Sequence, residues 1–397
     1  MSQGVYASNR HRSAVRRRLV VVGAVLAILV GTAVAGYAAV IRGDGGPGHW
    51  QAAPTDAPGG TGGATQAAPT EDAAPDQVIT LSATGDIVMG NAPSRLPPNG
   101  GQGFFDAVRE ALKSDLPMGN LEEPLTNDTG VRKCGANSTA CHQFRAPPEY
   151  AKHLKQAGFK LLNQANNHGY DYGAAGYENT QQALEAQGLK HTGAPDQITV
   201  VEVKGVKVAV LGFSSYRWSN SLIDLAAAKR VVAQAAKQAD VVVVQVHMGA
   251  EGSDKTRVKR GTEMFSGENR GDPMAFSRAV IDAGADLVVG HGPHVLRGME
   301  FYKGRLIAYS LGNFAGGQGT LSNSGRLAWG GVLHVSLHSD GTWAGGEFRS
   351  TYMNGSGRPT PDPDNRGLKA LRDLSQSDFG GSAATFGSDG EIKPPAA

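Results

Sequence analysis

The stretch DLVVGHGPHVLRGMEFYKGRLIAYSLGNF, residues Asp286–Phe314, is the part of the chain from which we interpret the rest. It begins with an apolar run, Leu287–Val289, that predicts a buried strand. The run ends at GHGPH, Gly290–His294, where two glycines and a proline predict a tight loop. Two imidazoles three positions apart on a loop at the carboxyl end of a strand can bind one metal ion. The alternative is that both histidines are turn residues bonded to the backbone.

The overall charge is nearly balanced, with 38 Lys and Arg against 36 Asp and Glu, so composition predicts no nucleic-acid partner. The start of the chain is different, because residues 1–18 are basic and residues 19–41 carry no charge. This pattern predicts a transmembrane anchor with a cytoplasmic N-terminus and an extracytoplasmic main domain. A cleaved signal peptide is the alternative, since Ala33–Ala35 is a typical cleavage site, but the apolar run continues beyond it.

The rest of the chain divides by composition. Residues 42–76 are rich in Gly, Ala, Pro and Thr and have no apolar period, which predicts a disordered linker, although a mucin-like stalk would look similar. In residues 77–355 strand and helix patterns alternate, which predicts an α/β domain of stacked layers. Residues 356–397 are polar and rich in Gly and Pro, so we expect a flexible C-terminal tail with one short helical stretch, Leu368–Leu374.

Within the α/β domain the expected strands are Val78–Thr84, Val206–Phe213, Asp240–Val246, Asp286–Val289 and Arg305–Tyr309, followed by a β-hairpin over Trp329–Thr351. The expected helices are Glu149–Ala157, Tyr177–Gln187, Leu222–Ala239 and Met274–Ala283. The last of these has Asp272 as its N-cap, Pro273 as its first residue and Gly284 as its stop.

The two cysteines, Cys134 and Cys141, enclose a polar loop. An exported domain lies in an oxidising compartment, where this pair can form a disulfide bond. The alternative is a pair of metal thiolates, but a spacing of this kind without further cysteines is not typical of zinc sites. We therefore predict a disulfide.

Polar residues that can bind metal follow several apolar runs, at the points where the expected strands end. These residues are Asp86, Asn120 and Glu122, Asn167 and His168, His247 and Glu251, and Asn313. Each alone is explained as a turn residue, a helix cap or a satisfied core histidine. Together they form a set of oxygen and nitrogen ligands that suits Mn, Fe or Zn, bound as one or two ions. Paired ions can hold a phosphoryl group and make a nucleophile from water, while a nearby histidine protonates the leaving oxygen.

The ordered segments GDIVMG, NLEEP, ANNHGYDYG, VHMGAE, GHGPHV and YSLGNF resemble the bacterial capsule synthesis proteins of the CapA (poly-γ-glutamate synthesis) type. The resemblance covers roughly Ile79–Phe314. It implies kinship with the calcineurin-like metallophosphoesterases, whose fold is a β-sandwich flanked by helices, and it implies a membrane anchor with an exported domain. The sequence contains no Walker A motif, dinucleotide-binding glycine motif or G-x-S-x-G elbow, so those enzyme classes lack support.

The resemblance also implies a role for each of these residues. Asp86 is similar to the first metal-binding aspartate, and Glu122 stands where a bridging acid is expected. Asn167 matches the ligand asparagine, and His168 matches the general acid. His247 resembles the histidine ligand at a strand end. His291 and His294 resemble the closing pair of ligands, while Asn120, Glu251 and Asn313 resemble capsule-group residues that support the ligands or face the substrate.

Four positions depart from the phosphoesterase or capsule patterns. Val88 stands where phosphoesterases have a histidine, Glu122 replaces an aspartate, Gly292–Pro293 lengthens the gap between the closing histidines by one residue, and Met248 replaces an aromatic residue. These departures leave open a single ion, or a polar pocket without metal.

The resemblance implies a membrane-anchored, surface-exposed protein that serves the production of poly-γ-glutamate or a related envelope polymer, with a metal-dependent, hydrolase-like site. Its expected partners are the polymer and its synthase or export machinery. Two alternatives are an extracellular metallophosphoesterase acting on envelope phosphodiesters and a scaffold subunit without catalytic activity.

Overall fold

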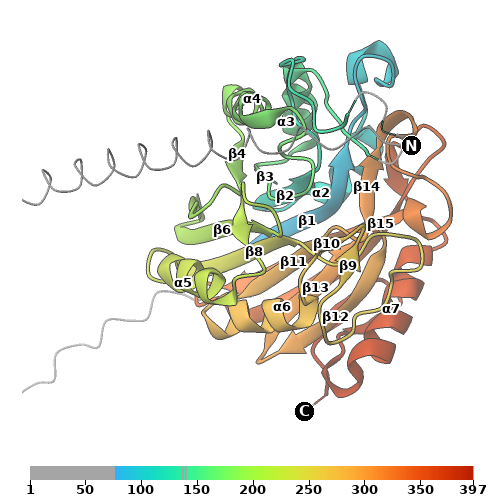
Figure 1. The fold of residues 1–397 in the computed structure, drawn as a ribbon. Coiled ribbons are helices and arrows are strands. Elements are labelled where there is room, and N and C mark those ends of the chain that lie inside the picture. The colour runs from blue at the N-terminus through green and yellow to red at the C-terminus, as the bar shows by residue number, and fades with distance from the viewer. Residues whose placement is uncertain (1–76, 136–137, 139–140, 397) are drawn as a thin grey trace, which may run out of the picture. The chain divides into compact units, whose positions relative to one another are not determined.

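Two β-sheets stacked face to face form the centre of the fold in the computed structural model, which describes residues 77–135, 138 and 141–396 (Figure 1). The first sheet has the order β17 (Pro359–Pro361), β16 (Trp343–Met353), β15 (Trp329–His338), β1 (Val78–Val88), β2 (Leu116–Leu121), β3 (Leu161–Asn163) and β4 (Lys190–Thr192), with β14 (Asn313–Gly316) paired to β1. The second has the order β12 (Leu296–Tyr302), β13 (Arg305–Leu311), β11 (Leu287–His291), β8 (Val241–His247), β6 (Val206–Ser214) and β5 (Thr199–Val203), with β7 (Asn220–Ser221) paired to β6.

Helices cover the outer face of each sheet. Those on the first sheet are α2 (Arg109–Leu112), α3 (Ala151–Ala157) and α4 (Gly173–Ala186), and those on the second are α5 (Leu225–Ala235) and α6 (Pro273–Asp282). The N-cap prediction for α6 is confirmed, because the Asp272 carboxylate accepts a hydrogen bond from the Ala275 amide at 2.9 Å. The α/β domain of stacked layers is therefore confirmed.

Strand β8 illustrates why the sequence folds into these layers. Its valines at positions 241 and 243 belong to the core between the two sheets, while those at 242 and 244 belong to the core under α5 and α6. Side chains alternate between the two faces of a strand, so a run of valines lets one strand fill both cores. The strand is parallel to its neighbours β6 and β11, and their carboxyl ends lie at one edge of the sheet.

A close backbone approach aligns the end of β1 with β14. Gly85 lies against Gly312, where an added Cβ would be 1.9 Å from the Gly312 carbonyl oxygen, so a side chain at Gly85 is excluded. The contact lets the Asp86 amide donate a hydrogen bond to that oxygen at 3.0 Å and places Asp86 opposite Asn313. The glycine thus sets the position of the first carboxylate of the candidate site.

The prediction of a flexible tail from residue 356 is wrong for the described residues. Strand β17 pairs with β16, α7 (Arg366–Phe379) packs on β12 and β16, and a two-stranded sheet of β18 (Thr385–Phe386) and β19 (Ile392–Lys393) follows. Leu368 and Leu371 of α7 enter the core between the sheets. Because only one narrow face of α7 is apolar, composition alone suggested a tail.

Replacing Leu371 with alanine is expected to lower the free energy of unfolding by about 2–5 kcal/mol, because its side chain is fully buried in the main core. The exposed Gln376→Ala on the same helix is the matched control and should change stability by no more than about 0.5 kcal/mol. Urea denaturation of both variants measures the difference. Equal, small effects would mean that α7 is not part of the cooperative fold.

The remaining small sheet, β9 (Met264–Phe265) with β10 (Glu268–Asn269), forms a hairpin in the loop after β8. The predicted hairpin over Trp329–Thr351 is confirmed as β15 and β16.

Among the residues that the structure describes, no helix has the length and apolar character needed to cross a membrane. The predicted anchor at residues 19–41 and the linker at 42–76 lie outside the described residues.

Candidate metal centre

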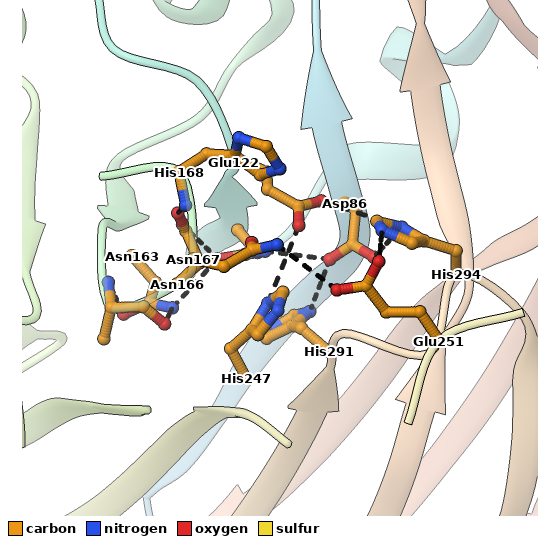
Figure 2. A network of polar contacts seen from close by, with 12 residues as sticks. Asp86, Glu122, Asn163, Asn166, Asn167, His168, His247, Glu251, His291 and His294 are labelled. Carbon is orange, nitrogen blue, oxygen red and sulfur yellow. Dashed lines mark hydrogen bonds and ion pairs between the residues drawn. The ribbon is translucent and has the colours of Figure 1, made fainter. Parts of the chain in front are cut away.

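The carboxyl ends of strands from both sheets meet at one place and bring the predicted residues together. Asp86 comes from β1, Glu122 follows β2, and His247 and His291 end the neighbouring strands β8 and β11, where they are paired in register. Figure 2 shows the two carboxylates and the imidazole rings pointing toward one another. The convergence expected from parallel strand ends is therefore present in the fold.

Three of these residues form the tightest group. Asp86, Glu122 and His247 each offer one ligand atom, and these atoms all lie within 4.8 Å of one another. His291 Nδ1 lies 3.9 Å from Asp86 Oδ1. His294 Nδ1 lies 3.1 Å from Asp86 Oδ2 and 3.8 Å from Glu122 Oε2. Asp86, Glu122, His247 and His291 are fully buried, so the group is removed from water.

The atoms that face this group lack hydrogen-bond partners. Both carboxylate oxygens of Glu122, both ring nitrogens of His247, Nδ1 of His291 and Oδ1 of Asn167 are buried without one. A buried polar atom left unpaired costs about 1–3 kcal/mol, so a group of them in one place requires an explanation. Each of these four side chains can donate a lone pair to a cation, His247 through one of its two ring nitrogens. The residues present therefore fit a divalent metal ion with oxygen and nitrogen ligands.

Electrostatics support the same interpretation. Burial and the neighbouring Asp86 charge raise the pKa of Glu122 well above its usual value. Burial lowers the pKa of His247 far below that of a free imidazole and lowers the pKa of His291 to about 4. Both rings are therefore neutral at pH 7, which is the form that binds metal.

His294 differs from the other two histidines. Burial alone would lower its pKa, but the Glu122 charge and its contacts with Asp86 and Glu251 raise that pKa well above the usual value. Its backbone has φ = 60°, in the left-handed region that few non-glycine residues adopt. Its ring lies near the carboxylates of Asp86, Glu122 and Glu251, and the expectation that His294 binds metal stays a prediction.

Several side chains hold the candidate ligands in place from outside. Asn120 donates to Asp86 Oδ1 at 2.8 Å, and its own carbonyl oxygen accepts hydrogen bonds from Asn163 and Asn166. Gln245 Oε1 lies 3.2 Å from His291 Nε2, which leaves Nδ1 of that ring facing the centre. Such contacts fix the orientation and tautomer of metal-binding side chains.

Asn313 does the same for His294. Its Oδ1 lies 2.9 Å from His294 Nδ1, and its amide nitrogen donates to the Leu327 carbonyl at 3.0 Å. The resemblance predicts that Asn120 and Asn313 support the ligands or face the substrate, and in the structure each contacts a candidate ligand. Their roles in chemistry stay predictions.

Glu251 links Asn167 to a buried arginine. Its Oε1 accepts a hydrogen bond from Asn167 Nδ2 at 3.2 Å and pairs with Arg270 Nη2, while its Oε2 lies 3.6 Å from His294 Nε2. Burial would raise the pKa of Glu251, but His294 and Arg270 outweigh it and hold that pKa at about 2. Because the Asn167 amide nitrogen is bound to Glu251, its unpartnered Oδ1 is the atom left to face a metal ion.

We expect Glu251→Gln to weaken manganese binding about 10–100-fold, because the substitution removes the charged acceptor that orients the Asn167 amide. Calorimetric titration with Mn²⁺ measures the change. In an Asn167→Ala background, where there is no amide to orient, the same substitution should have little further effect. Losses that simply add in the double variant would contradict this coupling.

His168 lies at the edge of the centre and pairs with an acid. Its Nδ1 is 2.7 Å from Asp171 Oδ2, and Asp171 also lies 3.1 Å from the Lys133 ammonium. Phe144 stacks on the imidazole with ring centroids 4.2 Å apart. Burial lowers the pKa of His168, against the opposing charge of Asp171. The Asp171 contact fixes the ring and leaves Nε2 as the nitrogen that can exchange a proton with a substrate.

The structure brings all ten predicted site residues into one cluster and adds three that the sequence prediction missed: Asp171, Gln245 and Arg270. Arg270 is 1% exposed, and its guanidinium lies over the rings of Tyr216 and Phe265 at 5.6 and 5.5 Å. The predicted disulfide between Cys134 and Cys141 is also present, outside this centre.

Comparisons with known proteins agree with the pattern of motifs. Residues 80–318 match the family described as bacterial capsule synthesis protein PGA_cap. The chain is 32% identical over 267 residues to the PGA biosynthesis protein CapA of Bacillus subtilis, covering 62% of this chain and 65% of that protein. It is 33% identical over 268 residues to the capsule biosynthesis protein CapA of Bacillus anthracis, covering 62% and 61%. The chain thus spans less than two thirds of the length of these relatives.

Among solved structures, the 5'-nucleotidase precursor from Thermus thermophilus aligns with a TM-score of 0.38 and 16% identity, covering 76% of this chain and 59% of that one. The match to the capsule family extends over more than half of the chain and includes every residue of the metal centre from Asp86 to Asn313. This chain is therefore a member of the bacterial capsule synthesis protein PGA_cap family.

Proposed function

We propose that this protein serves the production of poly-γ-glutamate or a related envelope polymer, and that its centre is a metal-dependent hydrolase site. The observation that carries the proposal is the set of unpartnered ligand atoms on Glu122, Asn167, His247 and His291 around Asp86. When bound by such ligands, a divalent ion would polarise the bond to be cleaved and would supply a nucleophile from water at neutral pH. The kinship with calcineurin-like metallophosphoesterases is part of this proposal.

The residues of the chain divide the work as follows. The residues that would hold the ion are Asp86, Glu122, Asn167, His247, His291 and His294. Asn120 and Gln245 keep two of them, Asp86 and His291, oriented. His168, fixed at Nδ1 by Asp171, protonates the leaving oxygen through Nε2. The location would be the outer face of the membrane, reached through the predicted anchor at residues 19–41, with the polymer and its synthase or exporter as partners.

The test is a measurement of bound metal and of turnover on the full-length chain. We expect the purified protein to bind manganese, iron or zinc and to hydrolyse bis(4-nitrophenyl) phosphate, with loss of activity on chelation and recovery on metal addition. Metal without turnover of this phosphodiester would leave polymer cleavage as the activity of the centre. If the protein has neither bound metal nor turnover, the hydrolase proposal is refuted and a scaffold subunit is favoured.

A His168→Ala substitution separates proton donation from metal binding. We expect kcat to fall by about 10²–10⁴-fold for phosphodiesters with alkyl leaving groups, because these need a proton to depart. The loss should be much smaller for bis(4-nitrophenyl) phosphate, whose leaving group departs as an anion. Metal content should not change. An equal loss for both substrates would argue against a general acid at this position.

A further inference from the structure

A groove beside α7 is lined by side chains that do not belong to the candidate metal centre. Two neighbouring hollows of about 360 and 410 Å³ share Trp329 and Arg366 as lining residues. We call the combined feature the α7 groove and define it by Leu296, Arg326, Trp329, Tyr352, Arg366 and Lys369. Hollows of this size accommodate a small ligand or a few units of a chain.

The backbone that forms one wall of the groove also positions the centre. Leu296 begins β12 two residues after His294. Arg326 precedes Leu327, whose carbonyl accepts the hydrogen bond from the Asn313 side chain. The backbones of Leu296 and Trp329 both pack closely on Gly312, directly before Asn313. The groove and the candidate metal centre therefore share backbone segments, although none of the centre's side chains lines either hollow.

Three basic residues line the groove; Arg366 is paired with two acids, Asp362 and Asp364, and the other two have no carboxylate partner among the described residues. Arg326 and Lys369 are exposed, and neither has a carboxylate partner within the described part of the chain. Arg366 pairs with Asp362 at 2.8 Å but keeps a side chain that is 37% exposed, lying over the Tyr352 ring at 4.8 Å. One acid, Asp373, is among the lining residues of the two hollows.

Unpaired cations beside aromatic and aliphatic surface suit an anionic ligand that also carries methylene groups. We propose that the α7 groove binds a γ-linked glutamate chain, with α-carboxylates on Arg326 and Lys369 and methylenes against the half-buried Trp329. This assignment rests on the proposed function for the identity of the polymer. It gives the protein a means of holding an acidic chain outside the metal centre.

The test is calorimetric binding of γ-linked glutamate oligomers of about ten units to the full-length chain at physiological salt. The wild type should bind the oligomer, and the double variant Arg326→Glu with Lys369→Glu should bind it at least about tenfold more weakly. The milder Arg326→Ala with Lys369→Ala should weaken it less. The matched control, Lys229→Glu with Arg230→Glu on α5, carries the same charge change at exposed positions and should bind like wild type.

Several outcomes would overturn the groove assignment. One is that the wild type does not bind the glutamate oligomer. The others are that wild type and the groove variants bind it equally, or that the groove and α5 variants lose the same amount of affinity for it. A groove variant that loses affinity for phosphatidylglycerol vesicles but keeps the oligomer would assign the cations to a membrane surface instead. Metal content and bis(4-nitrophenyl) phosphate turnover should be unchanged in the groove variants, so failure here is separate from failure of the hydrolase proposal.

Discussion

Asp86→Ala is expected to remove bound metal from the protein and to lower phosphodiester turnover on the order of 10³-fold or more. Asp86 is fully buried and lies within reach of His291, His294 and the Glu122–His247 pair. Its loss therefore removes a central ligand rather than a peripheral contact. Metal analysis by mass spectrometry and an assay with added manganese measure both effects. His247→Ala should give the same result, because it removes a second member of the same group.

A buried histidine outside the centre provides the matched control for these variants. His153 is 5% exposed, and its Nε2 contacts the Gly100 carbonyl at 2.7 Å. His153→Ala should lower stability without changing metal content or kcat. If Asp86→Ala retained full metal content, or if His153→Ala lost as much metal as His247→Ala, the assignment of ligands would be wrong.

Glu122→Gln is expected to have opposite effects on function and on stability. It should abolish metal binding, yet raise the free energy of unfolding of the metal-free protein by on the order of 1–3 kcal/mol at neutral pH. Glu122 is fully buried, both its oxygens lack hydrogen-bond partners, and Asp86 repels its charge. A glutamine has a similar shape and carries no charge, so the apo fold avoids this cost.

The pH dependence follows from the direction of the pKa shift. In the fold, the pKa of Glu122 is raised above its usual value of 4.5. The contribution of the Glu122 carboxyl group to folding stability is therefore fully present below pH 4.5 and is lost as the pH rises toward the higher pKa. The gain from Glu122→Gln should therefore grow with pH above 4.5 and vanish below it. Chemical denaturation of chelated proteins across this range measures it. A destabilised variant at pH 7 would contradict the account.

The strand-end ligands were predictable because a simple rule governs them. Asp86, His247 and His291 each close an apolar run, and parallel strands place such ends at one edge of a sheet. The Met274–Ala283 helix was predictable for a similar reason, because its Asp–Pro start and Gly stop are local signals. Local patterns therefore predict that the strand-end residues lie close together, as the structure has them.

Two missed residues left a signal in the sequence. Asp171 stands three positions after His168 in the same motif, a spacing that lets the two side chains meet in a turn. Gln245 stands two positions before His247 on β8, so strand periodicity places both on the same face. Both partners can therefore be identified from their spacing in the sequence.

Arg270 could not be predicted in the same way. It follows the β9–β10 hairpin, and its partner Glu251 lies 19 residues earlier, across a loop with no regular pattern. Only tertiary packing against Tyr216 and Phe265 places it beside the centre. The α7 helix was underestimated for a related reason, because two leucines hold it in the core while its other faces are polar.

Anomalous diffraction from crystals of the protein grown with manganese or zinc tests the central claim most directly. The account predicts an anomalous peak about 2.0–2.3 Å from donor atoms of Asp86 and His247, with Glu122, His291 or Asn167 completing the coordination. A peak located only at surface residues, or none in this buried cluster at saturating metal, would contradict it.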